Sequence, residues 1–321
     1  MASPAAAGYT LRPEFNVSFR EYAGFMQNMG MVGLEILKPI VVKKPSGSYN
    51  LISKEEWFKP VKTLVAPGSA FHRSKPAFTQ ATFSTTHHGH EEPIAWEEAA
   101  VWGGEVGDFY ALAQDRINGI LARELEQSLI TLLDNTTTFA DSAASAAWTT
   151  ASTDVLLDTD VAVNAFRLAN GAPPNVMVVD YSRYRGLLHN TKILAQLNGF
   201  GIKDPSMTPT MMNVEKLAQI FGVDRFVVAG MVVNSANEGQ DVNLASAWTS
   251  THVGFFRAPM SNDFREPCTG RTFVYNGDGA GEQVVFDSYD EPQTRSTVLR
   301  GRTWYGGEII DADQGYILTG A

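Results

Sequence analysis

One long amphipathic pattern dominates the middle of the chain. Across residues 108–134, apolar side chains recur at steps of three and four, and charged residues such as Arg116 and Arg123 fill the intervening face. Asp108 can accept hydrogen bonds from the free N–H groups of a first helical turn, and Asn135 can close the last turn. We therefore predict a helix over residues 108–134, roughly 40 Å long at about 1.5 Å per residue. Its apolar positions are Phe109, Ala113, Ile117, Ile120, Leu121, Leu125, Leu129, Leu132 and Leu133.

One residue inside this predicted helix is unfavourable for helix formation. Gly119 lies well inside it, where glycine costs about 1 kcal/mol relative to alanine. We expect Gly119 to permit the close approach of another backbone, such as a strand crossing the helix.

Strand patterns come before the helix. Residues 39–43 and 49–53 flank a turn-forming Pro-Ser-Gly-Ser segment, which predicts a β-hairpin, and residues 76–85 predict a further strand. Between Ile40 and Phe83 there is little helical pattern and too little alternation for a closed sheet. A segment of this length predicts a long excursion away from the body of the domain.

Helical and buried-strand patterns alternate after the long helix. Residues 136–152 are expected to form a surface loop or an edge hairpin. The helical and strand patterns that follow favour a mixed α/β unit between about residues 160 and 265. Helices are expected at 154–170, through 185–197 and at 215–221, with strands at 175–180 and 225–229.

The last part of the chain returns to strands. Residues 272–275 and 282–286 flank an Asn-Gly turn and predict a hairpin. Further strands are expected at 296–302, 308–310 and 316–318, and no internal repeat is visible.

The composition indicates a folded protein without a basic surface that could wrap nucleic acid. The 321 residues are 44% hydrophobic and 19% charged, which fits about two compact units. The net charge of −10 argues against wrapping nucleic acid through a basic surface. Cys268 is the single cysteine, so we expect no intrachain disulfide and a small buried side chain. Neither a signal peptide nor a membrane-spanning run is visible, so we expect a cytoplasmic protein without a membrane partner.

Candidate chemistry is sparse. His87, His88 and His90 stand close to two glutamates, but their spacing does not match the helical His-Glu-x-x-His arrangement. The glycines of a G-x-G-x-G run at residues 277–281 lack the spacing and the lysine of a phosphate loop. We expect no metal, no cofactor and no catalytic residue. A metal-dependent cytoplasmic α/β enzyme that uses His87, His88 and His90 stays the remote alternative.

Five segments carry a resemblance to a known family. Residues 39–49 (PIVVKKPSGSY) look like the start of an extended loop, and residues 108–134 look like a spine helix. Residues 214–230 (VEKLAQIFGVDRFVVAG) are followed by NSANEG and by a Trp with an apolar strand, WTSTHVGFF. In this order the chain resembles major capsid proteins of tailed bacteriophages with the Hong Kong 97-like fold, from about Pro39 to Leu318.

The resemblance implies an α+β chain divided into the parts of that fold. Residues 1–36 would form an N-terminal arm and residues 37–80 an extended β-hairpin loop. A peripheral domain would comprise residues 81–159, with the spine helix, and strands within residues 266–302. Residues 160–265 would form an axial domain, to which residues 303–321 return as a final strand.

The implied function is a structural shell protein and not an enzyme. Such chains assemble as pentamers and hexamers into an icosahedral shell that encloses double-stranded DNA, here in the host cytoplasm. A separate scaffolding protein is expected because no charged helical segment precedes the arm, together with a portal and possible decoration protein. DNA contact would be weak and non-specific. An encapsulin-like compartment shell on the same fold is the nearer alternative.

The residues of the extended loop suggest subunit contacts. Aromatic side chains lie in a segment too extended to bury them, and lysines and an arginine lie among them on an acidic chain. A neighbouring subunit should cover them, with the charges fixing the register. The contact residues we predict are Tyr49, Lys54, Trp57, Phe58 and Arg73.

Overall fold

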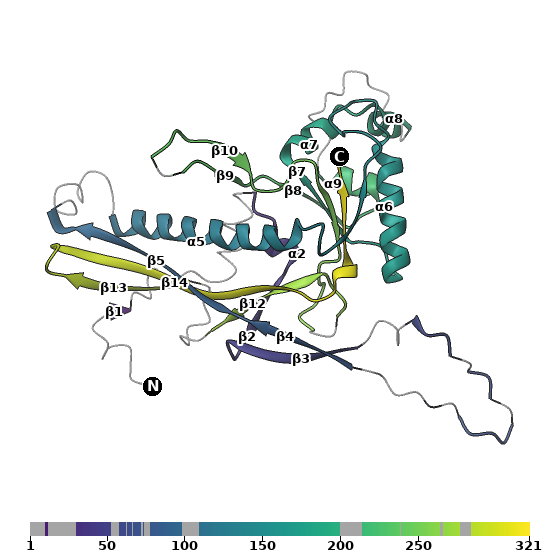
Figure 1. The fold of residues 1–321 in the computed structure, drawn as a ribbon, viewed down its shortest axis with the longest axis horizontal. Helices are drawn as coiled ribbons and strands as arrows, with labels where there is room; N and C mark the ends of the chain where they lie inside the picture. Colours follow the sequence, from purple (N-terminus) through teal and green to yellow (C-terminus); the bar gives the residue numbers. More distant parts are fainter. Residues whose placement is uncertain are drawn as a thin grey trace.

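The chain folds into an elongated body with an extended hairpin projecting from it (Figure 1). A computed structural model describes residues 10–11, 30–52, 58–61, 63–65, 67–71, 73, 78–97, 109–199, 214–237, 239–263, 266–276 and 284–321. A long helix lies along one sheet, and a second sheet with its helices stands at one end of that helix (Figure 1). Among the described residues, no helix is long and apolar enough to span a lipid bilayer.

The predicted long helix is confirmed as α5, Phe109–Leu133. Ile117, Leu121, Leu125 and Leu129 are fully buried along one face, as their spacing predicted. After the helix, the side chain of Asn135 accepts hydrogen bonds from the N–H groups of Thr137 and Thr138 and stabilises the turn that follows α5. Asp108, the predicted residue at the start, lies outside the described residues.

The sheet beneath α5 has six strands. Its order is β1-β13-β14-β12-β2, and β5 pairs with β14 away from this path. The central strand β14, Ser296–Ile309, is 14 residues long, so it contacts several partners along its length. The others are β1 (Thr10–Leu11), β2 (Pro39–Val42), β5 (Thr86–Ala95), β12 (Gly270–Tyr275) and β13 (Val285–Glu291).

Both predicted hairpin pairings are wrong, although the strands exist. The strand β2 pairs in parallel with β12, and the following strand β3, Ser46–Ile52, pairs with β4, Phe78–Ser84. Likewise β12 and β13 are separated by β14. Local turn residues suggested the pairings, but packing between distant segments decides them: Ile40 and Val42 pack against Phe273.

Glycines on β14, and not Gly119 on the helix, allow the helix and the sheet to meet. A Cβ atom on Gly307 would lie 2.7 Å from Leu129 Cδ2, and one on Gly301 would lie 2.5 Å from Ile117 Cγ2. At Gly119, the nearest atoms belong to the Arg123 guanidinium of the same helix, at 3.8 Å. The expected backbone approach at Gly119 is therefore absent within the described part of the subunit.

A five-stranded sheet forms the second unit, in the order β6-β15-β11-β7-β8. The predicted strands are confirmed as β7 (Val176–Asp180), β8 (Arg225–Ala229) and β15 (Gly315–Thr319). The sheet also holds β6 (Ala140–Ala143) and β11 (Val253–Phe256). Thus the segment at 136–152 supplies an edge strand that runs parallel to β15, and its Trp148 is fully buried.

Helices surround this sheet. The predicted helices at 154–170 and 215–221 are confirmed as α6 (Val155–Asn170) and α9 (Val214–Phe221). The single helix expected through 185–197 is divided into α7 (Tyr181–Leu187) and α8 (Thr191–Gly199). Asn190 explains the break, because its side-chain oxygen accepts hydrogen bonds from the N–H groups of Lys192 and Ile193 and caps α8.

Three shorter elements and a 3₁₀ helix, Ala312–Gln314, complete the description of the elements. The strands β9 (Val232–Asn234) and β10 (Leu244–Ser246) form a hairpin of their own. The helix α2, Gly33–Ile36, packs against α5. At the end of α5, Asp134 Oδ1 lies 2.5 Å from His252 Nδ1, which joins the helix to the segment before β11.

Candidate assembly surface

The extended loop has a firmly packed base. Strands β3 and β4 pair over seven residues, and the rings of Tyr49 and Phe83 lie next to the fully buried Phe273 of the six-stranded sheet. The Phe83 and Phe273 ring centroids are 4.5 Å apart and stacked. Thr85 donates both its N–H and its hydroxyl to the carbonyl of Pro45. The base of the loop is thus part of the subunit's own packing.

Beyond this base, the loop exposes large apolar side chains. Leu64 and Phe71 are 90% and 82% exposed, and the loop runs away from the body of the subunit (Figure 1). Phe58, Val61 and Phe78 are also exposed. A soluble monomer seldom displays so much apolar surface on one segment, because water contact with it is unfavourable. This loop is therefore the strongest candidate for a surface that another protein covers.

The five predicted contact residues differ from one another in their environment, and two of them are not described. Tyr49 is half-buried at the base, where burial raises the pKa of its hydroxyl to about 12. Phe58 is exposed, and Arg73 is exposed further along. Lys54 and Trp57 lie outside the described residues. The subunit contacts themselves stay a prediction.

Phe58 also touches the second unit of the subunit. Its ring occupies the space that a Cβ atom on Gly171 would need. Gly171 ends α6 in the left-handed conformation, with a φ of 71°, which favours glycine at this position. The sequence reasoning missed this contact, and it also missed Val61, Leu64 and Phe71. The sequence did offer one signal for them. These three residues are apolar, but the segment that holds them shows neither helical nor strand periodicity.

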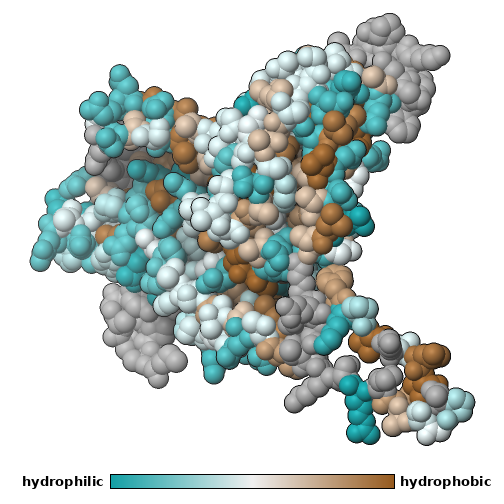
Figure 2. Space-filling view, turned by 45° about the vertical axis from the view of Figure 1, so that its right-hand side comes forward, coloured by the Kyte–Doolittle hydropathy of each residue, from teal (hydrophilic) through white to brown (hydrophobic). Residues whose placement is uncertain are grey.

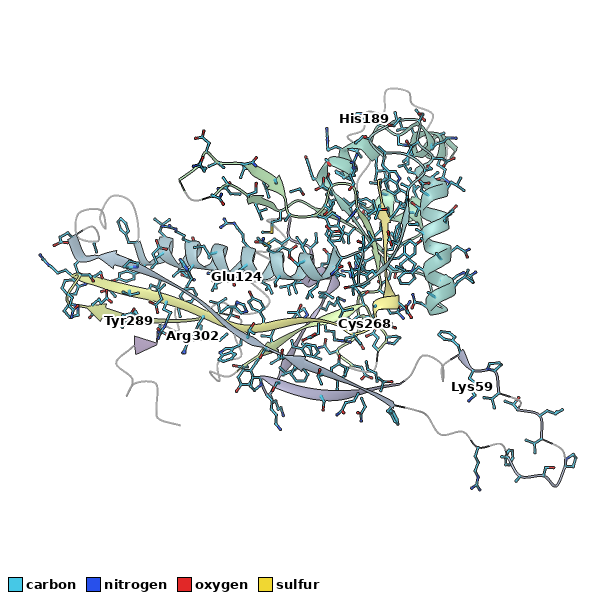
Figure 3. All side chains as sticks on the ribbon, in the orientation of Figure 1. Lys59, Glu124, His189, Cys268, Tyr289 and Arg302 are labelled. Atoms are coloured by element: carbon cyan, nitrogen blue, oxygen red, sulfur yellow. The ribbon has the colours of Figure 1, made fainter. Side chains whose placement is uncertain are left out.

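Positive charges accompany the apolar residues. Lys59 and Arg73 are exposed on the loop, and Figure 3 shows Lys59 far from the main body of side chains. The chain as a whole carries a net charge of −10. The loop can therefore attract an acidic surface of a partner protein.

A buried carboxylate fixes the segment that precedes the loop. Glu126 on α5 is fully buried, and its Oε1 accepts hydrogen bonds from the N–H groups of Val32 and Gly33 at 2.6 and 3.0 Å. Burial raises the pKa of Glu126 to about 7, although the two backbone donors act in the opposite direction. Nearby, Arg225 Nη1 lies 3.0 Å from Glu35 Oε1. These contacts attach α2 to both units.

The histidine cluster is used for packing within the subunit. His88 Nδ1 lies 3.0 Å from Glu124 Oε1, and the His88 ring stacks on Tyr305. Figure 3 shows Glu124 on α5, above the sheet. The His87 ring stacks on Trp304. Nowhere in the described part of the chain do three His, Cys, Asp or Glu side chains come together in a way that could hold a metal ion.

Cys268 is buried, as expected, and lies close to the carbonyl of Gly270. Burial raises the pKa of its thiol to about 11, so the thiol is neutral at pH 7. This environment does not favour a nucleophilic cysteine.

Solved structures with the same fold are phage and virus-like particle proteins. A phage-related protein from Bordetella bronchiseptica RB50 matches with a TM-score of 0.67 and 16% identity, covering 95% of this chain and 98% of that one. A capsid chain of Cyanophage P-SCSP1u matches with a TM-score of 0.56 and 14% identity, over 90% and 88% of the two chains. No protein family profile and no curated protein matches the sequence.

A further match is the virus-like particle from Pyrococcus furiosus, with a TM-score of 0.54 and 13% identity, covering 95% of this chain and 97% of that one. These alignments cover nearly whole chains, so the likeness concerns the complete architecture and not one shared motif. The chain has the fold of phage capsid proteins.

Proposed function

We propose that this chain is a structural major capsid protein with the Hong Kong 97-like fold. Copies of it would form an icosahedral shell around double-stranded DNA. The observation that carries the proposal is the combination of this fold with an extended loop whose Leu64 and Phe71 are almost fully exposed. Exposed apolar surface of this kind marks a site that a partner covers.

The parts of the fold receive corresponding roles. Residues 1–36 act as an arm, residues 37–80 as the extended loop, and α5 as the spine of a peripheral domain that covers residues 81–159 and 266–302. Residues 160–265 form the axial domain, to which the segment 303–321 returns. In support, β15 pairs with β11 of the five-stranded sheet. Residues 303–309 still belong to β14 in the six-stranded sheet, so the return to the axial domain begins after Ile309.

In this proposal the loop holds neighbouring copies together. Phe58 and Arg73 contact the next subunit, together with Lys54 and Trp57, and Tyr49 connects the loop to its base. Val61, Leu64 and Phe71, which the sequence analysis did not name, add exposed apolar area among the described residues of the loop. Contacts of this kind need no covalent bond between subunits.

The proposed partners follow from the same role. Copies assemble as pentamers and hexamers in the host cytoplasm, with a separate scaffolding protein, a portal and optionally a decoration protein. The net charge of −10 keeps contact with packaged DNA weak, because few cations can release counterions from phosphate. The protein itself has no catalytic role.

A compartment shell on the same fold is the second candidate function. The observation that favours it is the similarity to the chain from Pyrococcus furiosus described as a virus-like particle. The two candidates differ in what the shell encloses. Nuclease treatment of purified particles separates them, since a phage head protects long double-stranded DNA and a compartment protects protein cargo.

The experiment that tests the proposal is electron microscopy of the purified protein. The chain is expressed alone and together with the neighbouring phage genes, and the products are examined by negative staining. Closed polyhedral particles of uniform size support a capsid protein. Only small soluble species under both conditions, from a chain with normal circular dichroism, would contradict it.

A further inference from the structure

The outer face of α6 carries an apolar stripe. Leu157, Val161 and Leu168 are all exposed, with Leu168 at 71%. With Asn164 they follow steps of four, three and four residues, which place them on one side of the helix. The opposite side of α6 is buried through Val155, Ala162 and Phe166. Figure 2 shows hydrophobic surface over this part of the molecule.

The hairpin formed by β9 and β10 carries a second apolar surface. Val232, Val242 and Leu244 are exposed, with Val242 at 70%. Pairing of Asn234 with Leu244 puts Val232 and Leu244 on the same face, while Val233 on the other face packs against the core. An isolated two-stranded hairpin is marginally stable in water. We call Val232, Val242 and Leu244 the hairpin face, and Leu157, Val161 and Leu168 the α6 stripe.

The two surfaces lie on opposite sides of the same unit. Figure 1 shows the β9–β10 hairpin extending above α5, away from α6, which stands at the far side of the five-stranded sheet. The hairpin follows β8 directly, and α6 contacts β15 and β11, so the same sheet supports both. One copy cannot bring its own hairpin onto its own α6. Two different surfaces on opposite sides of one chain can join copies head to tail, and such contacts form a ring when the rotation between successive copies closes.

The hairpin face and one end of the α6 stripe have charged neighbours of opposite sign. Asp241 is exposed next to Val242, and Arg167 is exposed next to Leu168, while the exposed Asp160 lies next to Val161. The Arg167 guanidinium donates a hydrogen bond of 3.2 Å to Asn164 Oδ1, which holds it beside the stripe. An ion pair between Asp241 of one copy and Arg167 of the next would fix the register of the apolar contact.

We propose that the hairpin face of one copy docks on the α6 stripe of the next copy, and that this head-to-tail contact forms the rings of the shell. The inference rests on the proposed function and adds the surfaces that join copies within a ring. The occupant of the α6 stripe is a second copy of this chain.

Cysteine cross-linking between differently marked copies tests this contact. One preparation carries Leu168→Cys and a second carries Leu244→Cys, and both substitutions are at exposed positions that the fold does not need. Cys268 is buried and its raised pKa keeps the thiol unreactive under mild oxidation. The two preparations are mixed before assembly, oxidised and examined on a non-reducing gel. A disulfide forms only where the two Cα atoms come within about 7 Å.

Head-to-tail docking predicts cross-linked dimers in the mixture and none in either preparation alone. Ala245→Cys serves as the matched control, because Ala245 is exposed beside Leu244 but belongs to the opposite face of the hairpin. Mixing it with Leu168→Cys should give no cross-link. A chain carrying both Leu168→Cys and Leu244→Cys should give a ladder of oligomers that ends at the ring size.

Other results overturn the inference in distinguishable ways. Cross-linked dimers from one single-cysteine preparation alone would indicate a symmetric contact between two like surfaces. Closed particles without cross-links in the mixture would exclude this docking while leaving the capsid function intact. Failure of the unsubstituted chain to form particles under either expression condition would contradict the proposed function, and with it the ring contact.

Discussion

The carboxylate of Glu126 lies against the backbone of Gly33, 93 residues earlier in the chain, with its two oxygens 3.0 and 2.9 Å from the Gly33 nitrogen. No larger residue fits at position 33, because a Cβ atom there would be 2.7 Å from both Glu126 Oε2 and Leu129 Cβ. The contact therefore combines a buried acid with a glycine that lets the backbone approach it. It holds the start of α2 on the middle of α5.

This contact predicts a pH dependence of stability. The pKa of Glu126 rises from 4.5 to about 7 in the folded subunit, so the folded state binds more protons than the unfolded state between these values. The stabilising contribution of the protonated acid is fully present below about pH 4.5 and is lost as the pH rises through 7. The shift corresponds to about 3 kcal/mol at most. Glu126→Gln should remove this part of the pH dependence, because glutamine does not titrate.

Thermal unfolding of the unassembled subunit at pH 5 and pH 8 checks this prediction. The unsubstituted chain should lose more stability between the two pH values than the Glu126→Gln variant. Asp115→Asn is the matched control, since Asp115 lies on the same helix but is exposed. Equal pH dependence in the Glu126→Gln variant and the unsubstituted chain would show that Glu126 ionises normally.

A second prediction concerns the glycines between α5 and β14. Gly301→Ala should lower the free energy of unfolding by about 1–3 kcal/mol, since overpacking forces neighbours to move, and a Cβ there meets Ile117 and Phe286 at 2.5 and 3.0 Å. Gly119→Ala should raise it by up to about 1 kcal/mol, because the nearest atoms are 3.8 Å away on a flexible arginine. Denaturant titration of both variants measures the difference.

The prediction requires that Gly301→Ala and Gly119→Ala change the free energy of unfolding in opposite directions. If Gly119→Ala lowered stability, the helix would have a close neighbour at that point after all. If it left the subunit stable but blocked shell formation, the neighbour would be another copy.

The third prediction is that the loop serves assembly more than folding. Replacing residues 53–77 with a short Gly/Ser linker keeps β3, β4 and the packing of Tyr49 and Phe83 on Phe273. Circular dichroism should therefore show normal helix content, while sedimentation should show small species and no shells.

A milder variant separates loop chemistry from loop length. Leu64→Ser combined with Phe71→Ser removes exposed apolar area and should also weaken assembly. Ser69→Ala, at an exposed position in the same loop, is its control. Normal shells from the linker variant would contradict the assigned role, and loss of all folded structure would place the loop in the subunit core.

The fourth prediction concerns the histidines. Replacing His87, His88 and His90 with alanine removes the stacking on Trp304 and Tyr305 and the contact with Glu124. Stability should fall by about 1–3 kcal/mol, since each aromatic contact contributes about 1 kcal/mol. Shell formation, followed by electron microscopy, should persist. A metal-dependent hydrolytic activity that disappears in this variant would instead support the enzyme alternative.

The sequence was informative wherever a pattern is local. The apolar steps of α5 and the Gly171 signal at the end of α6 predicted both helices to within a residue or two. Strand pairing, in contrast, joins residues that lie far apart in the sequence. The partner of Ile40 is Phe273, more than 200 positions away, and nearby turn residues could not indicate such a pairing.

Glu126 shows why the buried contact between α5 and α2 was missed. A glutamate in an amphipathic helix normally faces water. Its position offered one signal, because it follows Ala122 by four residues and precedes Leu129 by three, inside the apolar face. For Leu64 and Phe71 the sequence supplied the residue type, but only the arrangement of the loop revealed their exposure.

The strand order of the five-stranded sheet has a consequence for biosynthesis. β15 lies between β6 and β11, both of which the ribosome produces earlier. Until β15 emerges, β6 lacks its parallel partner and one edge of β11 stays open. A nascent chain therefore presents an incomplete sheet for most of its translation. Because open strand edges can pair with other chains, these edges of β6 and β11 are protected from mispairing only after β15 has been made.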